Sequence, residues 1–314
     1  MSGEGSASSG RLARLLRAGR FVVTSEVVPG RTADPAGVTA QALALIGAAD
    51  AVNVTDHPGA SARMSPVAGA GLVAAAGLEP IVQLTCRDRN RIALTGDLLG
   101  AWALGARAVL CLSGDPVRVG DHPDATAVDD LSVLDLVSLA RRLRDEGRTL
   151  SGAEVASPPR FLVGVAEAPL AEGADLQRLE AKADAGAEFV QTQMVFDVEA
   201  FAAWADRARA RGLLGRLSVL AGVGVPASAG ALRTLAERLP GIVVPDAVLE
   251  RLEAAGPDEQ AGEAVRIAAD LVRRLRRIEG IAGVHVMGLG RPEAVRRVVE
   301  AAGLAPRAAA PAGP

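Results

Sequence analysis

The stretch from Ala108 to Asp115, Ala-Val-Leu-Cys-Leu-Ser-Gly-Asp, decides the fold of this chain. Its first half is a short apolar run, which is typical of a strand that is buried on both faces. A glycine and a carboxylate follow at once, so the strand ends on a polar group. A buried strand with a polar carboxyl end is the repeating unit from which parallel α/β folds build their sites.

The same arrangement recurs along the chain. Short apolar runs occupy 21–27, 51–54, 80–85, 160–165, 189–192, 217–221 and 283–287, and helical patterns separate them. Polar residues stand at or just after the end of most runs: Glu26, Thr55, Thr85, Glu167, Gln193 and, less regularly, Arg291. Together with the opening stretch this makes about eight βα units, the number found in a closed barrel. The sequence therefore predicts an α/β fold, a (β/α)₈ TIM barrel.

Helix signals support this alternation. Asp34-Pro35 and Ser65-Pro66 each place a capping side chain directly before a proline, which favours the start of a helix. Helices are predicted over 89–104, 132–146, 175–185 and 197–210, with two or three more in 228–278 and a last one from Pro292. The long polar loop 114–130 indicates a functional or mobile segment. No G-x-G-x-x-G follows the first strand, which disfavours a Rossmann fold.

Composition fits one domain. The chain has 314 residues, 49% of them hydrophobic, and a net charge of −3. We expect a tail with a short helix over 1–19, the barrel over 20–303 and a disordered tail over 304–314. No basic stripe indicates nucleic-acid binding. No apolar run reaches the ~20 residues that a membrane span needs, and no signal-peptide pattern opens the chain. We therefore expect a cytoplasmic protein. Two cysteines, Cys86 and Cys111, and three scattered histidines lack metal-ligand spacing, so no metal site is predicted.

Glu26 is the first candidate for chemistry. It lies late in an apolar strand, where its side chain should point into the mouth of the barrel. Burial disfavours the charged form of a carboxyl group, and the protonated form suits a general acid. The alternative is a structural glutamate that pairs with a buried arginine such as Arg63 or Arg87.

Asp115 and Gln193 are candidates by position. Ser113-Gly114 can bring backbone N–H groups close to a ligand, and Asp115 follows them. The side-chain amide of Gln193 both donates and accepts hydrogen bonds, which suits the edge of a heterocycle such as a pterin or a flavin. The alternatives are a turn aspartate and a glutamine that caps a loop.

Two further groups have open interpretations. Asp175 and Lys182 are seven residues apart on one helix face, so they either reach a ligand's ribose and phosphate or lie on a solvated surface. Arg87, Asp88, Arg89, Asn90 and Arg91 form a dense polar loop after the third strand. It either binds an anionic ligand tail or neutralises itself through salt bridges.

Five separated motifs resemble the methylenetetrahydrofolate reductase family, in its order and spacing over residues 20–302. They are Ser-Glu-Val-Val-Pro at 25–29, Gln-Leu-Thr-Cys at 83–86, Leu-Ser-Gly-Asp at 112–115, Lys-Ala-Asp-Ala-Gly-Ala at 182–187 and Thr-Gln-Met-Val-Phe-Asp at 192–197. The resemblance implies a barrel that holds FAD, takes hydride from NADH or NADPH, and reduces 5,10-methylenetetrahydrofolate to 5-methyltetrahydrofolate. It also implies a homo-oligomer, with a partner subunit as a further possibility.

The resemblance implies roles for particular residues. Glu26 would be the general acid that protonates N10, and Asp115 would orient flavin and folate. Gln193 and Arg291, with Asp115, would bind the substrate, a tetrahydrofolate derivative. The expected FAD site comprises Thr55, Asp56, Gln83, Ser113, Gly114, Asp115, Ala166, Asp175, Arg178 and Lys182.

The chain also departs from the family pattern. Gln83, Ser113 and Ala166 stand where better-known members carry histidine, arginine and tyrosine. These departures leave two alternatives open. One is a reductase that works without flavin or with a partner protein. The other is a non-redox barrel that binds folate or assists methyl transfer.

Overall fold

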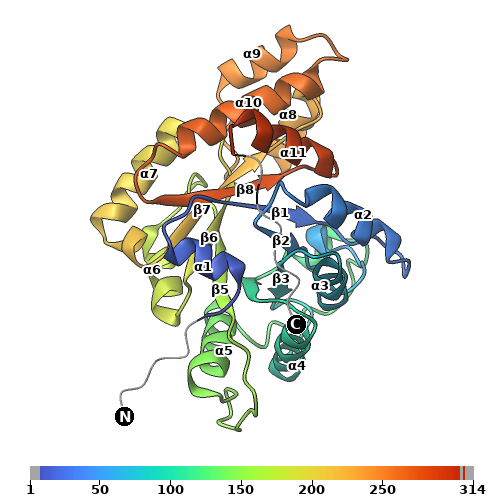
Figure 1. Ribbon diagram of the computed structural model, residues 1–314, viewed down its shortest axis with the longest axis vertical. Coiled ribbons are helices and arrows are strands. Elements are labelled where there is room, and N and C mark those ends of the chain that lie inside the picture. The colour runs from blue at the N-terminus through green and yellow to red at the C-terminus, as the bar shows by residue number, and fades with distance from the viewer. Residues whose placement is uncertain (1–7, 305–306, 308–314) are drawn as a thin grey trace.

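A computed structural model describes residues 8–304 and 307, and within them eight parallel strands close into a barrel in chain order, with β8 pairing to β1 (Figure 1). The predicted (β/α)₈ TIM barrel is confirmed. The strands are β1 Val22–Val27, β2 Ala51–Val54, β3 Pro80–Thr85, β4 Ala108–Leu112, β5 Leu162–Glu167, β6 Phe189–Met194, β7 Ser218–Gly224 and β8 Ile281–Met287.

Helices cover the outside of the barrel. They are α2 Ala36–Leu45, α3 Pro66–Ala75, α4 Arg91–Ala103, α5 Val133–Glu146, α6 Leu176–Ala185, α7 Val198–Ala210, α8 Ala229–Arg238, α9 Asp246–Ala254, α10 Gln260–Leu275 and α11 Pro292–Ala301. Capping side chains accept backbone N–H bonds at several helix starts. Ser65 does so at α3, as predicted, and Asp175 and Asp197 do so at α6 and α7. None of the described helices is both long and apolar enough to cross a bilayer.

Strand ends differ from the prediction by a few residues. β5 runs to Glu167 and β6 to Met194, because Glu167 pairs opposite Thr192 and Met194 pairs opposite Gly222 on β7. Between β7 and β8 the chain forms three helices, and α8 and α9 lie at the outer edge of the molecule (Figure 1).

The lower half of the barrel interior is apolar. Phe189 is fully buried there, and Gly164 on β5 makes room for it, since a Cβ at that glycine would lie 2.1 Å from the aromatic ring. A single aromatic ring thus fills a layer of the core that is otherwise built from aliphatic side chains. The other buried residues of this layer are Val22, Ala51, Ile81, Ala108, Leu110, Leu162 and Leu220.

The N-terminal helix α1, Arg11–Arg17, closes the lower end of the barrel. Leu12 and Ala13 are buried against the apolar layer. The Glu79 carboxylate accepts hydrogen bonds from the Arg11 and Leu12 backbone N–H groups, and its burial raises the pKa of this carboxyl group. With this end sealed, the opposite end, at the carboxyl termini of the strands, is the place for a site.

The chain ends were predicted to be tails. Residues 1–7, 305–306 and 308–314 lie outside the described residues, so the disordered C-terminal tail stays a prediction. Arg307 is described, and it packs under the barrel, where it donates to the Phe21 carbonyl at 3.0 Å and lies 3.4 Å from the Asp50 carboxylate.

Candidate functional site

Two groups of polar side chains surround the mouth of the barrel. One stands on β2, β3 and β4 and the loops after them, and the other on β6, β8 and β1. We call them the paired side and the open side. The difference between them is whether charged groups are neutralised within the protein.

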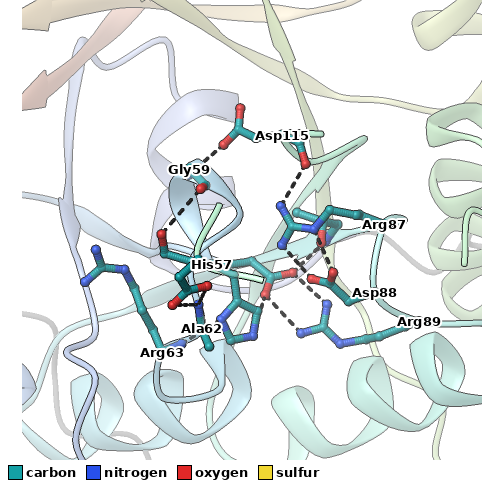
Figure 2. Close-up of polar contacts among 12 residues, drawn as sticks. His57, Gly59, Ala62, Arg63, Arg87, Asp88, Arg89 and Asp115 are labelled. Carbon is teal, nitrogen blue, oxygen red and sulfur yellow. Dashed lines mark hydrogen bonds and ion pairs between the residues drawn. The ribbon is translucent and has the colours of Figure 1, made fainter. Parts of the chain in front are cut away.

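On the paired side, Asp56 is the central residue. It is 4% exposed, and its two oxygens accept from the Arg89 guanidinium at 2.7 and 2.9 Å. One of them also accepts from the Thr85 N–H at 2.8 Å, and Arg89 reaches Asp97 on α4 at 2.8 Å. Figure 2 shows part of this network, which ties the loop after β2 to the loop after β3. Asp56 is therefore committed to holding these loops.

Arg87 links the next pair of loops. It is buried, lies 2.6 Å from Asp88 and donates to the Asp115 carbonyl at 3.1 Å (Figure 2). Burial works against the ionisation of Asp88, but the Arg87 bond and charge hold its pKa below the usual value. The charges of the polar loop 87–91 are thus neutralised by salt bridges, in agreement with one of its two predicted interpretations, although Arg89 and Arg91 pair with aspartates outside the loop.

Asp115 is exposed at the end of this network. Its Oδ2 accepts from the Gly59 N–H at 2.7 Å, so the loop after β2 orients the carboxylate. Gly114 has a φ of +90°, and a Cβ there would lie 3.1 Å from the Cβ atoms of Thr85 and Arg87. The close approach explains the glycine, and Ser113 before it is exposed.

The long loop after β4 is held down on the paired side. Asp121 accepts from the Ala62 N–H at 3.1 Å and from Arg31 at 2.6 Å. Val128 donates to the Arg87 carbonyl at 2.7 Å. The loop 114–130, which was predicted to be functional or mobile, is therefore hydrogen-bonded to the loops after β1, β2 and β3 and covers them.

Asp56, His57 and Asp88 approach one another closely enough to consider a metal ion, with ligand atoms within 4.8 Å. Both carboxylates are already paired to arginines, however, and the His57 Nδ1 accepts from the Arg63 N–H at 3.1 Å. Positive guanidinium groups beside the would-be ligands disfavour a cation. The absence of a metal site stays a prediction.

On the open side, Glu26 lies one residue before the end of β1, and its side chain is 18% exposed. Its side chain lies beside His285 on β8, with 3.8 Å between Oε2 and Nε2. The two arginines considered as partners are engaged elsewhere: Arg63 donates to the Pro29 carbonyl at 3.2 Å, and Arg87 pairs with Asp88. The alternative prediction, a structural ion pair of Glu26 with Arg63 or Arg87, is therefore wrong.

Arg291 and Gln193 complete the open side. Arg291 and Glu26 line one small gap of about 10 Å³ between the ends of β1 and β8. The Arg291 Nη2 donates to the Val225 carbonyl at 2.6 Å, while its buried Nε has no partner in the described structure. Gln193 at the end of β6 is half-buried, and its Oε1 accepts from the Met194 N–H at 3.0 Å. It is both a local cap and a residue of the mouth.

The residues expected around FAD divide into two sets, and Thr85, which was not among them, shares the features of the first. Thr55 and Thr85 bury hydroxyl groups that lack any hydrogen-bond partner among the described residues, which is unusual in a protein interior. Gln83 is half-buried on β3, two residues before Thr85 and so on the same face of the strand. These groups mark a place beside the paired side where a polar ligand would complete the hydrogen bonding.

The expected anchors on α6 are used by the protein. Lys182 lies 2.7 Å from the Glu167 carboxylate and 2.7 Å from the Ala166 carbonyl. Asp175 caps α6 by accepting from the Gln177 N–H at 2.9 Å. The structure does not bring Asp175 and Lys182 together, and Arg178 is exposed on the same helix. The sequence reasoning missed Glu167 as the partner of Lys182, although Glu167 already stood out as a strand-end carboxylate.

A closed parallel barrel with one sealed end and polar groups at the other is the arrangement of TIM-barrel enzymes. Comparison with known families makes this specific. The chain belongs to the methylenetetrahydrofolate reductase family, whose sequence model matches residues 11–303.

Curated relatives agree with this assignment. A 5,10-methylenetetrahydrofolate reductase of Pectobacterium carotovorum is 30% identical over 232 residues, which cover 73% of this chain and 72% of the relative. Methylenetetrahydrofolate reductase 1 of Schizosaccharomyces pombe is 26% identical over 236 residues, 72% of this chain. The matched part is only 36% of that yeast protein's length and 37% of a nematode relative's.

Among solved structures, an uncharacterized protein from Clostridium thermocellum that binds two copies of 5-methyltetrahydrofolic acid superposes with a TM-score of 0.61. It covers 93% of this chain and 98% of its own at 13% identity, so the likeness shows the fold.

Proposed function

We propose that the protein reduces 5,10-methylenetetrahydrofolate to 5-methyltetrahydrofolate at the open side of the mouth, with NADH or NADPH as the source of hydride. The observation that carries this proposal is the state of Glu26. It is a partly exposed carboxyl group on the inner face of β1, next to Arg291, and no arginine or lysine pairs with it in the described structure. An acid that the protein leaves unneutralised is available for proton transfer.

The reaction needs one proton and one hydride. Glu26 gives its proton to N10 of the folate, the bond between N10 and the methylene carbon breaks, and the five-membered ring opens to an iminium at N5. Hydride adds to the methylene carbon, and the product is the N5-methyl compound. Glu26 is left as a carboxylate and regains a proton from water. In this scheme Gln193 offers an amide to the pterin, and the Arg291 cation attracts the anionic folate.

Asp115 has a different part in this proposal. Gly59 fixes its carboxylate from one side, and its exposure leaves the remaining lone pairs to a ligand. We assign it to orientation of the pterin and of the hydride donor, since it lies on the paired side and not beside Glu26. It is not the proton donor.

The family resemblance implies FAD as the hydride carrier, and the residues can be tested for that fit. The unpartnered hydroxyls of Thr55 and Thr85 suit a polar ring. The anchors expected for the phosphates and ribose do not fit: Glu167 neutralises Lys182, Asp175 caps a helix, and Asp56 is buried against Arg89. This arrangement does not suit a tightly held dinucleotide flavin.

That observation favours a second candidate, in which the reduced nicotinamide delivers hydride to the folate directly. The overall reaction and the role of Glu26 are the same in both cases. Cytoplasmic location, which the sequence led us to expect, is a further proposal. A homo-oligomer and a possible partner subunit are proposals that rest on the family resemblance.

The test is the visible absorbance of the purified protein, followed by an assay of NADH and NADPH oxidation with and without 5,10-methylenetetrahydrofolate. We expect oxidation that depends on folate, with 5-methyltetrahydrofolate as the product. A yellow protein that NADH bleaches supports a flavin carrier, and a colourless active protein supports direct transfer. A colourless protein that binds 5-methyltetrahydrofolate and never oxidises either nicotinamide overturns the proposal in favour of a non-redox folate-binding barrel.

A further inference from the structure

One layer below Glu26, the barrel interior holds a chain of buried polar side chains. Asn53 on β2, Gln191 on β6, Thr24 on β1 and His285 on β8 are each at most 4% exposed. They face one another across the barrel, between the apolar lower layer and the mouth. Neither the strand-end pattern nor the family motifs marks them.

Hydrogen bonds join these side chains, and the Asn53 and Gln191 amides donate to each other. Asn53 Nδ2 donates to Gln191 Oε1 at 2.6 Å, which turns the Gln191 amide nitrogen toward Asn53 Oδ1 and Thr24 Oγ1, both at 3.2 Å. Thr24 Oγ1 therefore accepts from Gln191. Its own hydrogen remains for His285 Nδ1, which lies 3.0 Å away.

This order favours one tautomer of the imidazole, because the Thr24 hydroxyl already accepts from Gln191 and its own hydrogen can go to His285 Nδ1. If Thr24 donates to Nδ1, then Nδ1 is an acceptor and the ring proton of neutral His285 is on Nε2. Nε2 is the atom that faces Glu26 Oε2, at 3.8 Å. Within the described structure, Glu26 and Arg291 are the charged groups near this point, and the neighbours on β2, β6 and β7 are the neutral Asn53, Gln191 and Gly222.

We propose that His285 is a positioning residue for Glu26, held by Thr24, Gln191 and Asn53 in the Nε2–H tautomer. This inference rests on the proposed function. As Glu26 gives up its proton, negative charge develops on its carboxylate, and an N–H group already aimed at it strengthens its interaction at that moment. A closing movement of less than 1 Å brings Nε2 and Oε2 into ordinary hydrogen-bond range.

The first experiment reads the tautomer without any assay of activity. The chain has three histidines, so ¹⁵N-labelled imidazole spectra are assigned by comparison with His57→Gln and His122→Gln. We expect the neutral Nε2–H form for His285, and a mixture of tautomers in Thr24→Val, which removes the hydroxyl at nearly constant volume. An Nδ1–H form in the wild type overturns the inference.

The second experiment compares two replacements of His285. Glutamine places an amide N–H near the position of Nε2, whereas asparagine reaches Thr24 but not Glu26. We expect His285→Asn to lower kcat by about 100-fold, the size of effect seen when one fixed donor is removed, with the folate KM nearly unchanged. We expect His285→Gln to recover most of the loss.

The same two replacements of His285, made in a Glu26→Gln variant, distinguish the positioning role of His285 from the proposed function of the protein. If His285 acts through Glu26, His285→Asn lowers kcat no further once Glu26 is gone. An equal loss in both backgrounds, with unchanged thermal melting, overturns the role of His285 and leaves the proposed function intact. Full activity of Glu26→Gln overturns the proposed role of Glu26, while the imidazole spectra still decide the tautomer.

Discussion

The two sides of the barrel mouth use charged residues in opposite ways. On the paired side, the arginines and aspartates of three loops neutralise one another, as Arg89 does with Asp56 and Arg87 with Asp88. On the open side, neither Glu26 nor Arg291 forms an ion pair with an arginine, lysine, aspartate or glutamate in the described structure. The ionisable side chain that Glu26 faces is the imidazole of His285. The region richest in charge is thus scaffold, and the sparsely charged region is where proton transfer is proposed.

The difference has a physical cause. A buried aspartate is tolerated when an arginine binds both of its oxygens, and removal of either partner leaves an uncompensated charge. Such pairs fix loop positions but hold no proton that they can give away. A carboxyl group without a cationic partner keeps the choice between its two protonation states, which a general acid requires.

Glu26→Gln should have the largest effect on activity. The amide keeps the size of the side chain but has no acidic proton, so we expect folate-dependent turnover to fall by about 10²–10⁴-fold. The unfolding midpoint in urea should stay close to wild type, because no ion pair to an arginine is lost. The measurement is steady-state oxidation of the reduced nicotinamide with 5,10-methylenetetrahydrofolate. If a bound flavin is present, its reduction by NADH should survive.

Asp97→Asn is the matched control on the paired side. Asp97 is half-buried and touches only the outer edge of the network through Arg89. We expect activity within about threefold of wild type, since this side chain does not reach the open side. Equal losses of activity in Asp97→Asn and Glu26→Gln would erase the distinction between the two sides.

The sequence was sufficient for the fold because each strand is a short apolar run and most of these runs end in a polar residue, and that pattern is local. It also placed Glu26, Gln193 and Asp115 at strand ends. It could not choose partners, because partners are set by tertiary distance. Lys182 binds Glu167 from the neighbouring strand, while Asp175, its predicted companion on the same helix, caps the helix start.

The buried polar layer could have been predicted from the positions of His285 and Gln191 in the sequence. Both occupy inward positions of their strands, Gln191 two residues before Gln193. The two-residue period of a strand puts them under the mouth. Polar residues at such positions were treated as parts of apolar runs, so the buried layer emerged only from the structure.

Asp56→Asn should have the largest effect on stability. The amide cannot bind both guanidinium nitrogens of Arg89 as an ion pair, so the mostly buried Arg89 charge keeps only its contact with Asp97 as compensation. We expect a loss of about 3 kcal/mol in the free energy of unfolding, measured by urea titration. The matched control is Glu146→Gln, which breaks an exposed pair with Arg142 one helical turn away, and should cost under about 1 kcal/mol. Similar costs for the two variants would mean that the paired side is not the scaffold.

The smallest effect concerns the thiol of Cys86, which directly follows Thr85 on the paired side. Burial, with added repulsion from Asp129 and Asp135, raises the pKa of this thiol to about 11. At pH 8 it is therefore protonated and covered, and we expect iodoacetamide to label it far more slowly than in the urea-unfolded chain. The labelling rate should rise only as pH climbs toward 11.

The same thiol reports whether the loops open locally. Cys111 on β4 is buried more deeply and serves as the internal control, and mass spectrometry of tryptic peptides separates the two labelling rates. In Asp56→Asn we expect Cys86 to react before Cys111, because the loops after β2 and β3 loosen while the barrel stays closed. In Glu26→Gln both rates should match wild type. Equal acceleration of both cysteines in Asp56→Asn would indicate global unfolding and would show that the charge network stabilises the whole barrel instead of its cover.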